Sequence, residues 1–152
     1  MKTSLDFIKI VQNKTSSQKS LYATKPFAKA AIITAFSAGI VSKIPTYLTI
    51  QIRIDKHITL NPTKLQFCNH SCTPNVFFDT TMFQLLALKD INAGDELTFF
   101  YPSSEWNMTQ SFACNCGNKN CLANIKGAAH ISKEVLANYR LTNFIQEMLA
   151  TQ

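Results

Sequence analysis

Short apolar runs dominate the first 130 residues and predict β-strands rather than helices. The runs cover residues 5–11, 30–36, 75–78, 83–88 and 97–101. Each is shorter than an ordinary helix and is bounded by polar or turn-forming residues. Over residues 47–54, leucine and isoleucine alternate with polar residues, which predicts a strand with one dry and one solvated face. Asp79-Thr80-Thr81 lies between two runs and predicts a hairpin turn.

Helical spacing of apolar residues is found only near the C-terminus. The residues with this spacing are Val135, Leu136, Tyr139, Phe144, Ile145, Met148 and Leu149. Ser132 precedes them and is a suitable N-cap. We therefore expect one C-terminal helix packed on a mainly β chain, whose length of 152 residues suits a single domain.

The positive charge of the chain is concentrated near its N-terminus. The formal charge is +6, and residues 1–30 hold six lysines against one aspartate, a net +5. Such a segment attracts acidic partners, including nucleic acid, although a solvated basic surface is the simpler interpretation. The longest uncharged apolar run lies between Lys29 and Lys43 and is too short to span a bilayer. Because Asp6 and Lys9 interrupt the apolar stretch near Met1, we expect an intracellular protein, cytoplasmic or nuclear, without membrane contact.

Three cysteines close together form the strongest local signal: Cys114, Cys116 and Cys121. Gly and Asn between them favour a turn that wraps a metal, and zinc in a closed structural site takes four ligands. The spacing alone leaves the fourth ligand open among Cys68, Cys72, His57, His70 and His130. Disulfides or free buried thiols are the alternatives, but five cysteines without a secretory signal argue against a disulfide framework.

Two further segments carry candidate chemistry. Residues 67–75 crowd Asn, His and Ser between apolar strands, where buried polar groups need hydrogen-bond partners. A polar turn, a ligand clamp and a Cys–His nucleophile pair all fit this segment, the last without an evident orienting residue. Residues 94–101, taken alone, indicate a turn that leads into a buried aromatic strand.

Together and in this order, the three segments resemble the SET domain of protein lysine methyltransferases. The family's Asn-His-Ser-Cys-x-Pro-Asn block is complete at Asn69–Asn75, its Gly-[Glu/Asp]-Glu-Leu-Thr-x-x-Tyr block at Gly94–Tyr101, and its post-SET Cys-x-Cys-x4-Cys block at Cys114–Cys121. The resemblance covers residues 17–130. It implies a mainly β fold, the SET-domain β-clip of several small sheets with a threaded, pseudoknot-like C-terminal segment. The implied organisation is a SET domain over 1–111, a post-SET zinc segment over 112–130 and a helix over 131–152.

The resemblance implies methyl transfer from S-adenosylmethionine to a lysine of a histone tail or another basic protein. It makes Tyr101 the catalytic residue. It makes Cys72 the fourth zinc ligand beside Cys114, Cys116 and Cys121, and leaves Cys68 as a buried thiol. Cofactor contacts are implied for Lys19, Ser20, Leu21, Tyr22, Asn69, His70 and Leu122. Candidate walls of the substrate channel are Phe78, Phe99, Tyr47 and Trp106.

The chemistry explains why a tyrosine and a phenylalanine suit such a channel. A lysine ammonium has no lone pair, so it must lose a proton before it attacks a methyl carbon, and apolar surroundings lower its pKa. A tyrosine hydroxyl at Tyr101 orients the amine without being a strong base. Phe99 lies two residues earlier, on the same face of the strand. In the family, phenylalanine there permits two or three methyl groups, so we expect di- or trimethyllysine; core packing is the alternative role.

Two segments depart from the family pattern. The Gly-x-Gly motif is replaced by Gln18-Lys19-Ser20, which adds side-chain bulk where the family's backbone approaches the cofactor. The Glu-Tyr-x-Gly-Glu stretch corresponds to residues 35–39, so Phe36 replaces a tyrosine and Tyr47 is a candidate substitute. The alternative function is therefore an inactive SET-like module, stabilised by zinc, that binds protein or nucleic acid.

Overall fold

The computed structural model describes residues 6–152, so Lys2 of the basic segment and Leu5 of the first apolar run lie outside the described residues. The strands are β1 (Ile8–Gln12), β2 (Lys19–Ala23), β3 (Ile32–Ala35), β4 (Ser37–Ser42), β5 (Ile50–Arg53), β6 (Lys56–Asn61), β7 (Asn69–His70), β8 (Val76–Asp79), β9 (Gln84–Ala87), β10 (Thr98–Phe99), β11 (Phe112–Ala113) and β12 (Asn124–Ile125). The helical elements are the 3-10 turns η1 (Thr63–Phe67), η2 (Tyr101–Ser103) and η3 (Ala128–His130), and the helices α1 (Lys133–Leu136) and α2 (Asn143–Ala150). The expected mainly β class is confirmed.

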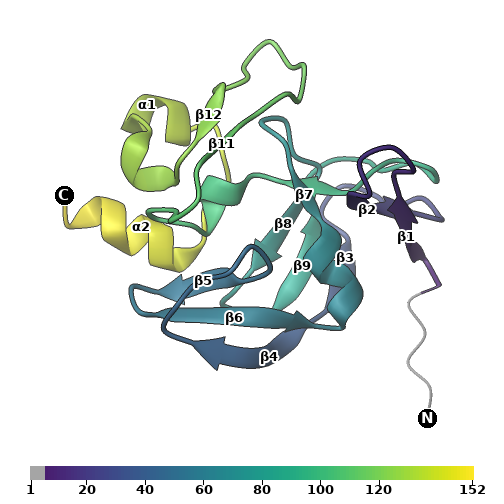
Figure 1. Ribbon diagram of the computed structural model, residues 1–152, viewed down its shortest axis with the longest axis horizontal. Coiled ribbons are helices and arrows are strands. Elements are labelled where there is room, and N and C mark those ends of the chain that lie inside the picture. Colours follow the sequence, from purple (N-terminus) through teal and green to yellow (C-terminus); the bar gives the residue numbers. More distant parts are fainter. Residues whose placement is uncertain (1–5) are drawn as a thin grey trace.

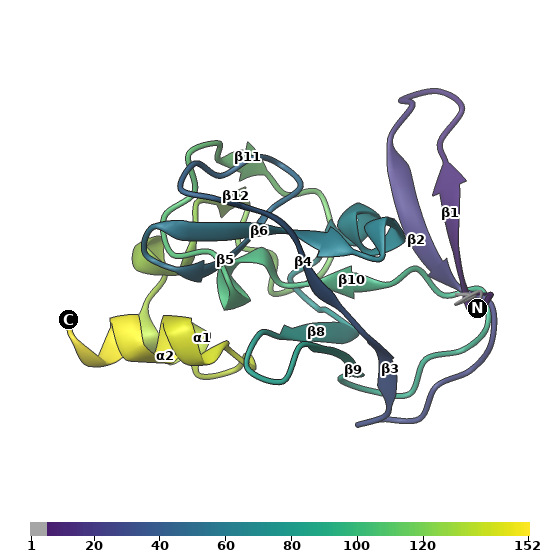
Figure 2. The same cartoon turned by 90° about the horizontal axis from the view of Figure 1, so that it is seen from below.

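The strands form several small sheets instead of one large one. Two sheets have three strands, in the orders β3–β9–β8 and β4–β6–β5, and the other pairs are β1–β2, β11–β12 and β7–β10. Figures 1 and 2 show the β1–β2 hairpin at one end of the molecule and α1 and α2 at the other. No helix within residues 6–152 has the length and apolar character needed to cross a membrane.

One parallel pair, β7 with β10, joins two segments that are far apart in the sequence. Asn69 lies opposite Thr98, and His70 lies opposite Phe99. The Asn75 side chain reinforces the pairing, because its Oδ1 accepts from the Thr98 N–H at 2.9 Å and its Nδ2 donates to the Glu96 carbonyl at 2.8 Å. Two of the three sequence segments with candidate chemistry are therefore held side by side.

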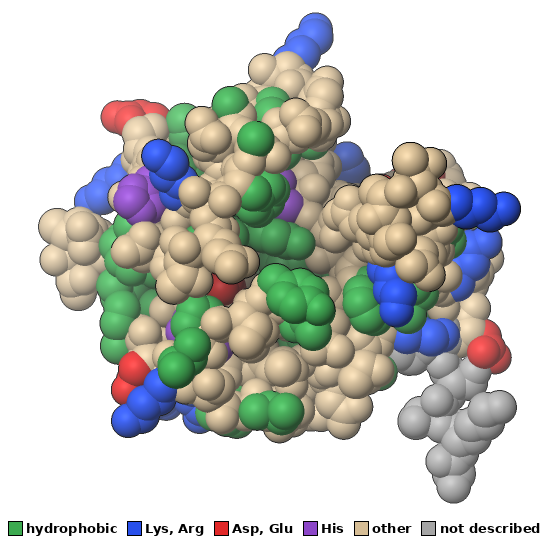
Figure 3. Space-filling model, viewed as in Figure 1, with side chains coloured by type: hydrophobic (Ala, Val, Ile, Leu, Met, Phe, Trp, Pro, Cys, Tyr) green, Lys and Arg blue, Asp and Glu red, His purple; other side chains and the backbone are tan. Residues whose placement is uncertain are grey.

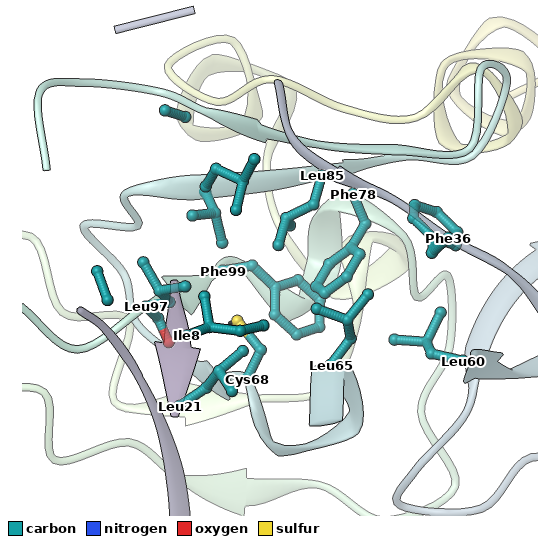
Figure 4. Packing of buried hydrophobic residues seen from close by; sticks show 14 of the residues in the cluster. Ile8, Leu21, Phe36, Leu60, Leu65, Cys68, Phe78, Leu85, Leu97 and Phe99 are labelled. Carbon is teal, nitrogen blue, oxygen red and sulfur yellow. Dashed lines mark hydrogen bonds between the residues drawn. The ribbon is translucent and has the colours of Figure 1, made fainter. Parts of the chain in front are cut away.

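The main core lies beneath this junction. Figure 4 shows Phe36, Phe78 and Phe99 side by side, with the sulfur of Cys68 directed into the same apolar cluster. The rings of Phe78 and Phe99 meet edge to face with centroids 4.9 Å apart, an arrangement that aromatic pairs prefer. The apolar runs of the sequence thus support the strands that carry the candidate site.

The expected C-terminal helix is present, but it is not continuous: two short helices are separated by residues 137–142. Tyr139 explains the break: its ring stacks on Phe100 with centroids 3.6 Å apart, and its hydroxyl donates to the Cys72 carbonyl at 2.6 Å. A new N-cap follows, since the Thr142 hydroxyl accepts from the N–H of Ile145. Ser132 caps α1 as expected.

The predicted strand over residues 47–54 is shorter and less regular than its pattern indicated. Only Ile50–Arg53 form β5, and Gln51 is 6% exposed whereas Ile54 is 61% exposed. Gln51 tolerates burial because its Oε1 accepts from the Trp106 N–H at 2.9 Å. The hairpin after Arg53 places Ile54 in a turn, where the alternation of the strand ends.

Candidate active site and metal centre

Asn69 connects the second sequence segment to the hairpin. Its Nδ2 donates to the Lys19 carbonyl and to the Ser20 hydroxyl, both at 3.0 Å. Both hydrogens of this amide are therefore used inside the protein, and its Oδ1, which has no partner among residues 6–152, can accept from a ligand. The replaced Gly-x-Gly segment and the Asn-His pair meet at this point.

His70 holds the backbone of the candidate catalytic residue. Its Nδ1 accepts from the Tyr101 N–H at 3.1 Å, which places the ring proton on Nε2, 3.4 Å from Cys72 Sγ. Burial lowers the pKa of His70 to about 4, so the ring is neutral near pH 7. Both ring nitrogens already have protein partners, so a contact with a cofactor would use the ring face or the backbone.

Tyr101 begins η2 directly after the aromatic strand and is half-buried. Its ring centroid lies 4.7 Å from that of Phe99 and 5.2 Å from that of His70. Burial raises the pKa of the Tyr101 phenol, and the negative charge of the nearby Glu105 carboxylate raises it further. The hydroxyl therefore stays protonated at neutral pH, where it can donate and accept hydrogen bonds but is not a phenolate base.

Two of the four predicted channel residues lie beside Tyr101. Phe99 contacts Tyr101, and Phe78 contacts Phe99, both as buried rings. Tyr47 is 84% exposed on the loop between β4 and β5, and Trp106 packs in a separate apolar cluster near the C-terminus. Within residues 6–152, neither Tyr47 nor Trp106 makes a ring contact with the other two.

One face of the molecule is hollowed. Figure 3 shows the hollow between the lobe that carries β1 and β2 and the part that carries β11 and β12. Of the predicted cofactor contacts in β2, the Leu21 side chain is fully buried in the core, so it would act only through its backbone. Lys19, Ser20 and Tyr22 keep exposed surface, as does Leu122 near β12.

The structure gathers four cysteines into one cluster. The Sγ atoms of Cys72, Cys114, Cys116 and Cys121 all lie within 4.8 Å of one another. A tetrahedral zinc site with bonds near 2.3 Å separates its sulfurs by about 3.8 Å, and the Cys72 and Cys114 sulfurs are 3.9 Å apart. The cluster therefore fits a structural zinc ion. Cys68 lies apart in the core, where its thiol donates to the Leu97 carbonyl at 3.4 Å.

Comparison with known proteins shows which family this chain belongs to. Residues 6–102 match the SET domain family. The chain belongs to the SET domain family. The methyltransferase flvH of Aspergillus flavus is similar over nearly the whole chain, with 37% identity over 148 residues that cover 96% of this chain and 81% of that protein. The family and this relative support S-adenosylmethionine-dependent methyltransferase activity.

Other relatives share only part of the chain. The H3 lysine-36-specific histone-lysine N-methyltransferase of Debaryomyces hansenii is 33% identical over 70 residues, which are 42% of this chain and 9% of that protein. The H3 lysine-4-specific enzyme of Emericella nidulans is 35% identical over 80 residues, 45% of this chain and 7% of that protein. The chain thus spans less than a tenth of the length of these histone methyltransferases.

Solved structures agree on the fold. The structure of KRYPTONITE in complex with mCHG DNA and SAH superimposes with a TM-score of 0.61 at 21% identity, over 80% of this chain and 30% of that one. The methyltransferase domain of human SETMAR gives a TM-score of 0.57 at 18% identity, over 79% of this chain and 58% of that one. The expected SET-domain fold is confirmed.

The replaced Gly-x-Gly motif does not strain the backbone of this SET domain. Lys19 and Ser20 lie in the regular strand β2, and among the residues near this motif only Ser17 has a positive φ, of 62°. The positions of the missing glycines therefore need no glycine-specific conformation. What the replacement adds is side-chain volume and the Ser20 hydroxyl, which Asn69 holds in place.

Glu105 is a site-adjacent residue that the sequence did not single out. Its Oε2 accepts from the Gln51 N–H at 2.9 Å and from the Ser104 hydroxyl at 2.7 Å. Burial raises the pKa of Glu105 to about 7, although these two donors oppose the shift. Because Gln51 lies 54 positions away from Glu105 in the sequence, no local sequence pattern could have predicted that these two residues are hydrogen-bonded.

Proposed function

We propose that this SET domain transfers methyl groups from S-adenosylmethionine to lysine ε-amines of a histone or another basic protein. The observation that carries the proposal is the position of Tyr101, whose backbone is held by His70 and whose ring lies against Phe99. Relatives that share about two fifths of the chain are named for histone lysine methylation. The structural neighbours include KRYPTONITE with an H3 peptide and SAH.

S-adenosylmethionine, when bound, supplies an electrophilic methyl group on a sulfonium centre. The free Oδ1 of Asn69, the backbone near His70 and the exposed side of Ser20 would hold it, with Leu122 against it from the post-SET segment. S-adenosylmethionine has charged and apolar parts, so the acceptor Asn69 Oδ1 and the apolar side chain of Leu122 both suit it.

The chain's own residues account for the reactivity of the amine. Phe78 and Phe99 exclude water, which disfavours an ammonium and lowers the pKa of the lysine. The protonated Tyr101 hydroxyl, which burial keeps neutral, then aligns the lone pair of the amine toward the methyl carbon. Tyr101 is thus a catalytic residue through orientation and not through proton abstraction.

Phe99 supports more than one methyl transfer per lysine. Its ring carries no hydroxyl that would hold a water or the amine, so space remains for a methylated amine to turn. We expect the wild type to form di- or trimethyllysine and the Phe99→Tyr variant to stop mainly at monomethyllysine. Mass spectrometry of a peptide substrate driven to completion measures this; a wild type that stops at one methyl contradicts the role of Phe99.

The proposed substrate also suggests a partner and a cellular location for this protein. Histone substrates would place the protein in the nucleus, and the basic N-terminal segment would favour an acidic surface near the substrate, nucleic acid included. Lys19 and Lys25 already lie over aromatic rings, at 5.0 Å from Phe67 and 5.4 Å from Phe27. Their ammonium groups remain exposed and carry no carboxylate partner among residues 6–152.

Labelled S-adenosylmethionine tests the function directly. The protein is incubated with core histones, with ribosomal proteins and with small amines in separate reactions, and the label is located by mass spectrometry. The proposal predicts label on protein lysines. Cofactor binding without transfer to any acceptor supports the inactive binding module instead, and transfer to small amines alone contradicts a protein substrate.

A further inference from the structure

A cavity of about 380 Å³ lies apart from the methyl-transfer residues. Its walls come from the loop that precedes β8, from β8 itself, from the residues after β9, from η2, from Asn120 and from the turn after α1. Figures 1 and 2 show α1 at the end of the molecule opposite the β1–β2 hairpin, with β8 between them. Neither Asn69 nor Tyr101 lines this cavity.

Apart from Cys72, whose sulfur belongs to the metal cluster, the charged residues that line this cavity are cationic. Lys89 and Arg140 line it, and no aspartate or glutamate does. The guanidinium of Arg140 lies 4.8 Å above the ring centre of Phe77, which holds the group in place while its N–H edge stays available. Among the described residues, neither cation has a carboxylate partner. Two cations that share one cavity repel each other, so an anion between them is favoured.

Ser103 gives the cavity a hydroxyl group. The residue is 3% exposed, and its backbone is satisfied, since its N–H donates to the Phe100 carbonyl and its carbonyl accepts from Thr142. Its hydroxyl has no hydrogen-bond partner within residues 6–152. Among the described residues, His57 Nδ1 is the one buried side-chain nitrogen or oxygen without a partner, so the Ser103 hydroxyl keeps access to solvent. Ser103 lines the cavity, where its hydroxyl can donate to a ligand oxygen.

The remaining walls are partly apolar, with Thr73, Asn120 and Asn138 as further polar lining residues. Val76, Phe77 and Leu88 contribute carbon surface, and Tyr139 stacks on Phe100 at the back. Apolar walls with a few polar groups are typical of sites for small molecules. Cationic groups together with an apolar wall favour a ligand that carries both an anionic group and an apolar part.

We propose that this cavity binds a small organic anion, a carboxylate or phosphate monoester attached to a flat apolar body. The anionic group lies between Lys89 and Arg140 and accepts from the Ser103 hydroxyl. The flat body lies against Phe77 and its aliphatic neighbours. Arginine favours both carboxylate and phosphate because its planar fork donates two parallel hydrogen bonds.

Matched probes separate charge from shape. Benzoate and phenyl phosphate carry the two anionic groups on the same ring, and benzamide has the shape of benzoate without its charge. At ten times the dissociation constant, an anion that binds only the folded protein raises the melting temperature by about 3–5 °C. Benzamide produces no comparable shift, and the more effective anion identifies the preferred group.

Variants locate the binding site. Lys89→Gln with Arg140→Gln removes both charges at exposed positions, so the fold is retained, and the shift caused by either anion is lost. Lys133→Gln is the matched control, since this exposed lysine of α1 does not line the cavity. It keeps the full shift. Ser103→Ala, by removing one hydrogen bond to the anion, weakens binding about tenfold.

Three results overturn the proposal. An equal shift with benzamide shows that charge does not select the ligand. An unchanged shift in the double variant places the anion elsewhere. No shift with either anion up to the solubility limit shows that the cavity does not bind this class. None of these readouts depends on methyl transfer, so the proposal stands or fails independently of the proposed function.

Discussion

The strands around Tyr101 and the cysteine segment beside them are stabilised by different means. Phe78, Leu85 and Phe99 of the first region are almost fully buried. In residues 112–126, only Ile125 is buried, and β11 and β12 pair through two residues each. Apolar burial stabilises the first region, whereas the second is too small to form a core and depends on four sulfurs that meet at one point.

This contrast teaches how a small SET domain completes its site. Within the apolar region, His70 holds the Tyr101 backbone and Phe99 packs on the Tyr101 ring. Phe112 of the second region adds an edge contact to the rings of both His70 and Tyr101, with centroids 5.7 Å from each. Leu122, a predicted cofactor contact, belongs to the other region, where its N–H donates to Cys72 Sγ at 3.4 Å. Metal binding should therefore affect cofactor affinity more than the position of the catalytic residue.

Loss of the metal has the largest expected effect. Cys72→Ser removes one of four ligands, and zinc contributes about 10 kcal/mol or more to small folded zinc sites. We expect this variant to lose zinc and to lose hydrogen-exchange protection over residues 112–126, while the core strands remain protected. Metal analysis and hydrogen exchange of the purified variant measure both effects.

Cys68→Ser is the control for this substitution. Cys68 is buried in the core and lies apart from the cluster. The Cys68→Ser variant should retain one zinc and protection over 112–126, at a modest cost in overall stability. Zinc loss from Cys68→Ser, together with zinc retention by Cys72→Ser, contradicts the ligand assignment.

Gly127→Ala has the next largest effect, because this glycine closes the cysteine segment against η3. Its φ is 107°, and an added Cβ would lie 2.5 Å from the Trp106 carbonyl oxygen. Gly94→Ala is the matched control, since its φ is 93° but nothing lies within 4 Å of its Cβ. We expect Gly94→Ala to lower the free energy of unfolding by about 1 kcal/mol, from the backbone alone. We expect Gly127→Ala to lower it by roughly 3 kcal/mol.

Urea unfolding of the two glycine variants compares these costs. Equal losses of stability would show that the Trp106 carbonyl moves aside freely and that the junction between the two regions is loose. A larger loss for Gly127→Ala supports a close backbone contact there.

Glu105→Gln has the smallest effect and changes the dependence of stability on pH. The pKa of Glu105 is raised from 4.5 to about 7, so the folded protein keeps a proton that the unfolded chain loses. Stability from this group therefore falls as pH rises from about 4.5 to 7 and stays reduced above. Glutamine is neutral and keeps an acceptor for the Gln51 N–H, so the variant should be about 1–2 kcal/mol more stable above this window.

The measurement is the difference in unfolding free energy between wild type and Glu105→Gln, taken below and above that window. Acid also protonates the zinc ligands, but this effect is common to both proteins and cancels in the difference. A constant difference at all pH values shows that the Glu105 carboxyl has an ordinary pKa.

The sequence predicted the parts of the fold that depend on local pattern. The apolar runs over 75–78 and 83–88 became β8 and β9, and consecutive residues of both strands are buried, as expected for short apolar runs covered on both faces. The three clustered cysteines indicated a metal from spacing alone, and the family resemblance added Cys72. The structure then brought all four sulfurs together.

Features that depend on distant partners were not predictable in this way. The break between α1 and α2 arises from Tyr139 meeting Phe100 and the Cys72 carbonyl, all remote in sequence. Gln51 is buried because Trp106 and Glu105 supply its partners. Tyr47, expected at the channel, is exposed because its loop lies outside the β4–β6–β5 sheet.

The central claim is that this SET domain methylates lysine with Tyr101 orienting the amine. The most direct measurement compares wild type and Tyr101→Phe for label transfer from S-adenosylmethionine to histone lysines, with cofactor binding measured in parallel. The account predicts normal cofactor binding and a fall in kcat of roughly 100-fold or more, since only the orienting hydroxyl is lost. Wild-type turnover by Tyr101→Phe would contradict it.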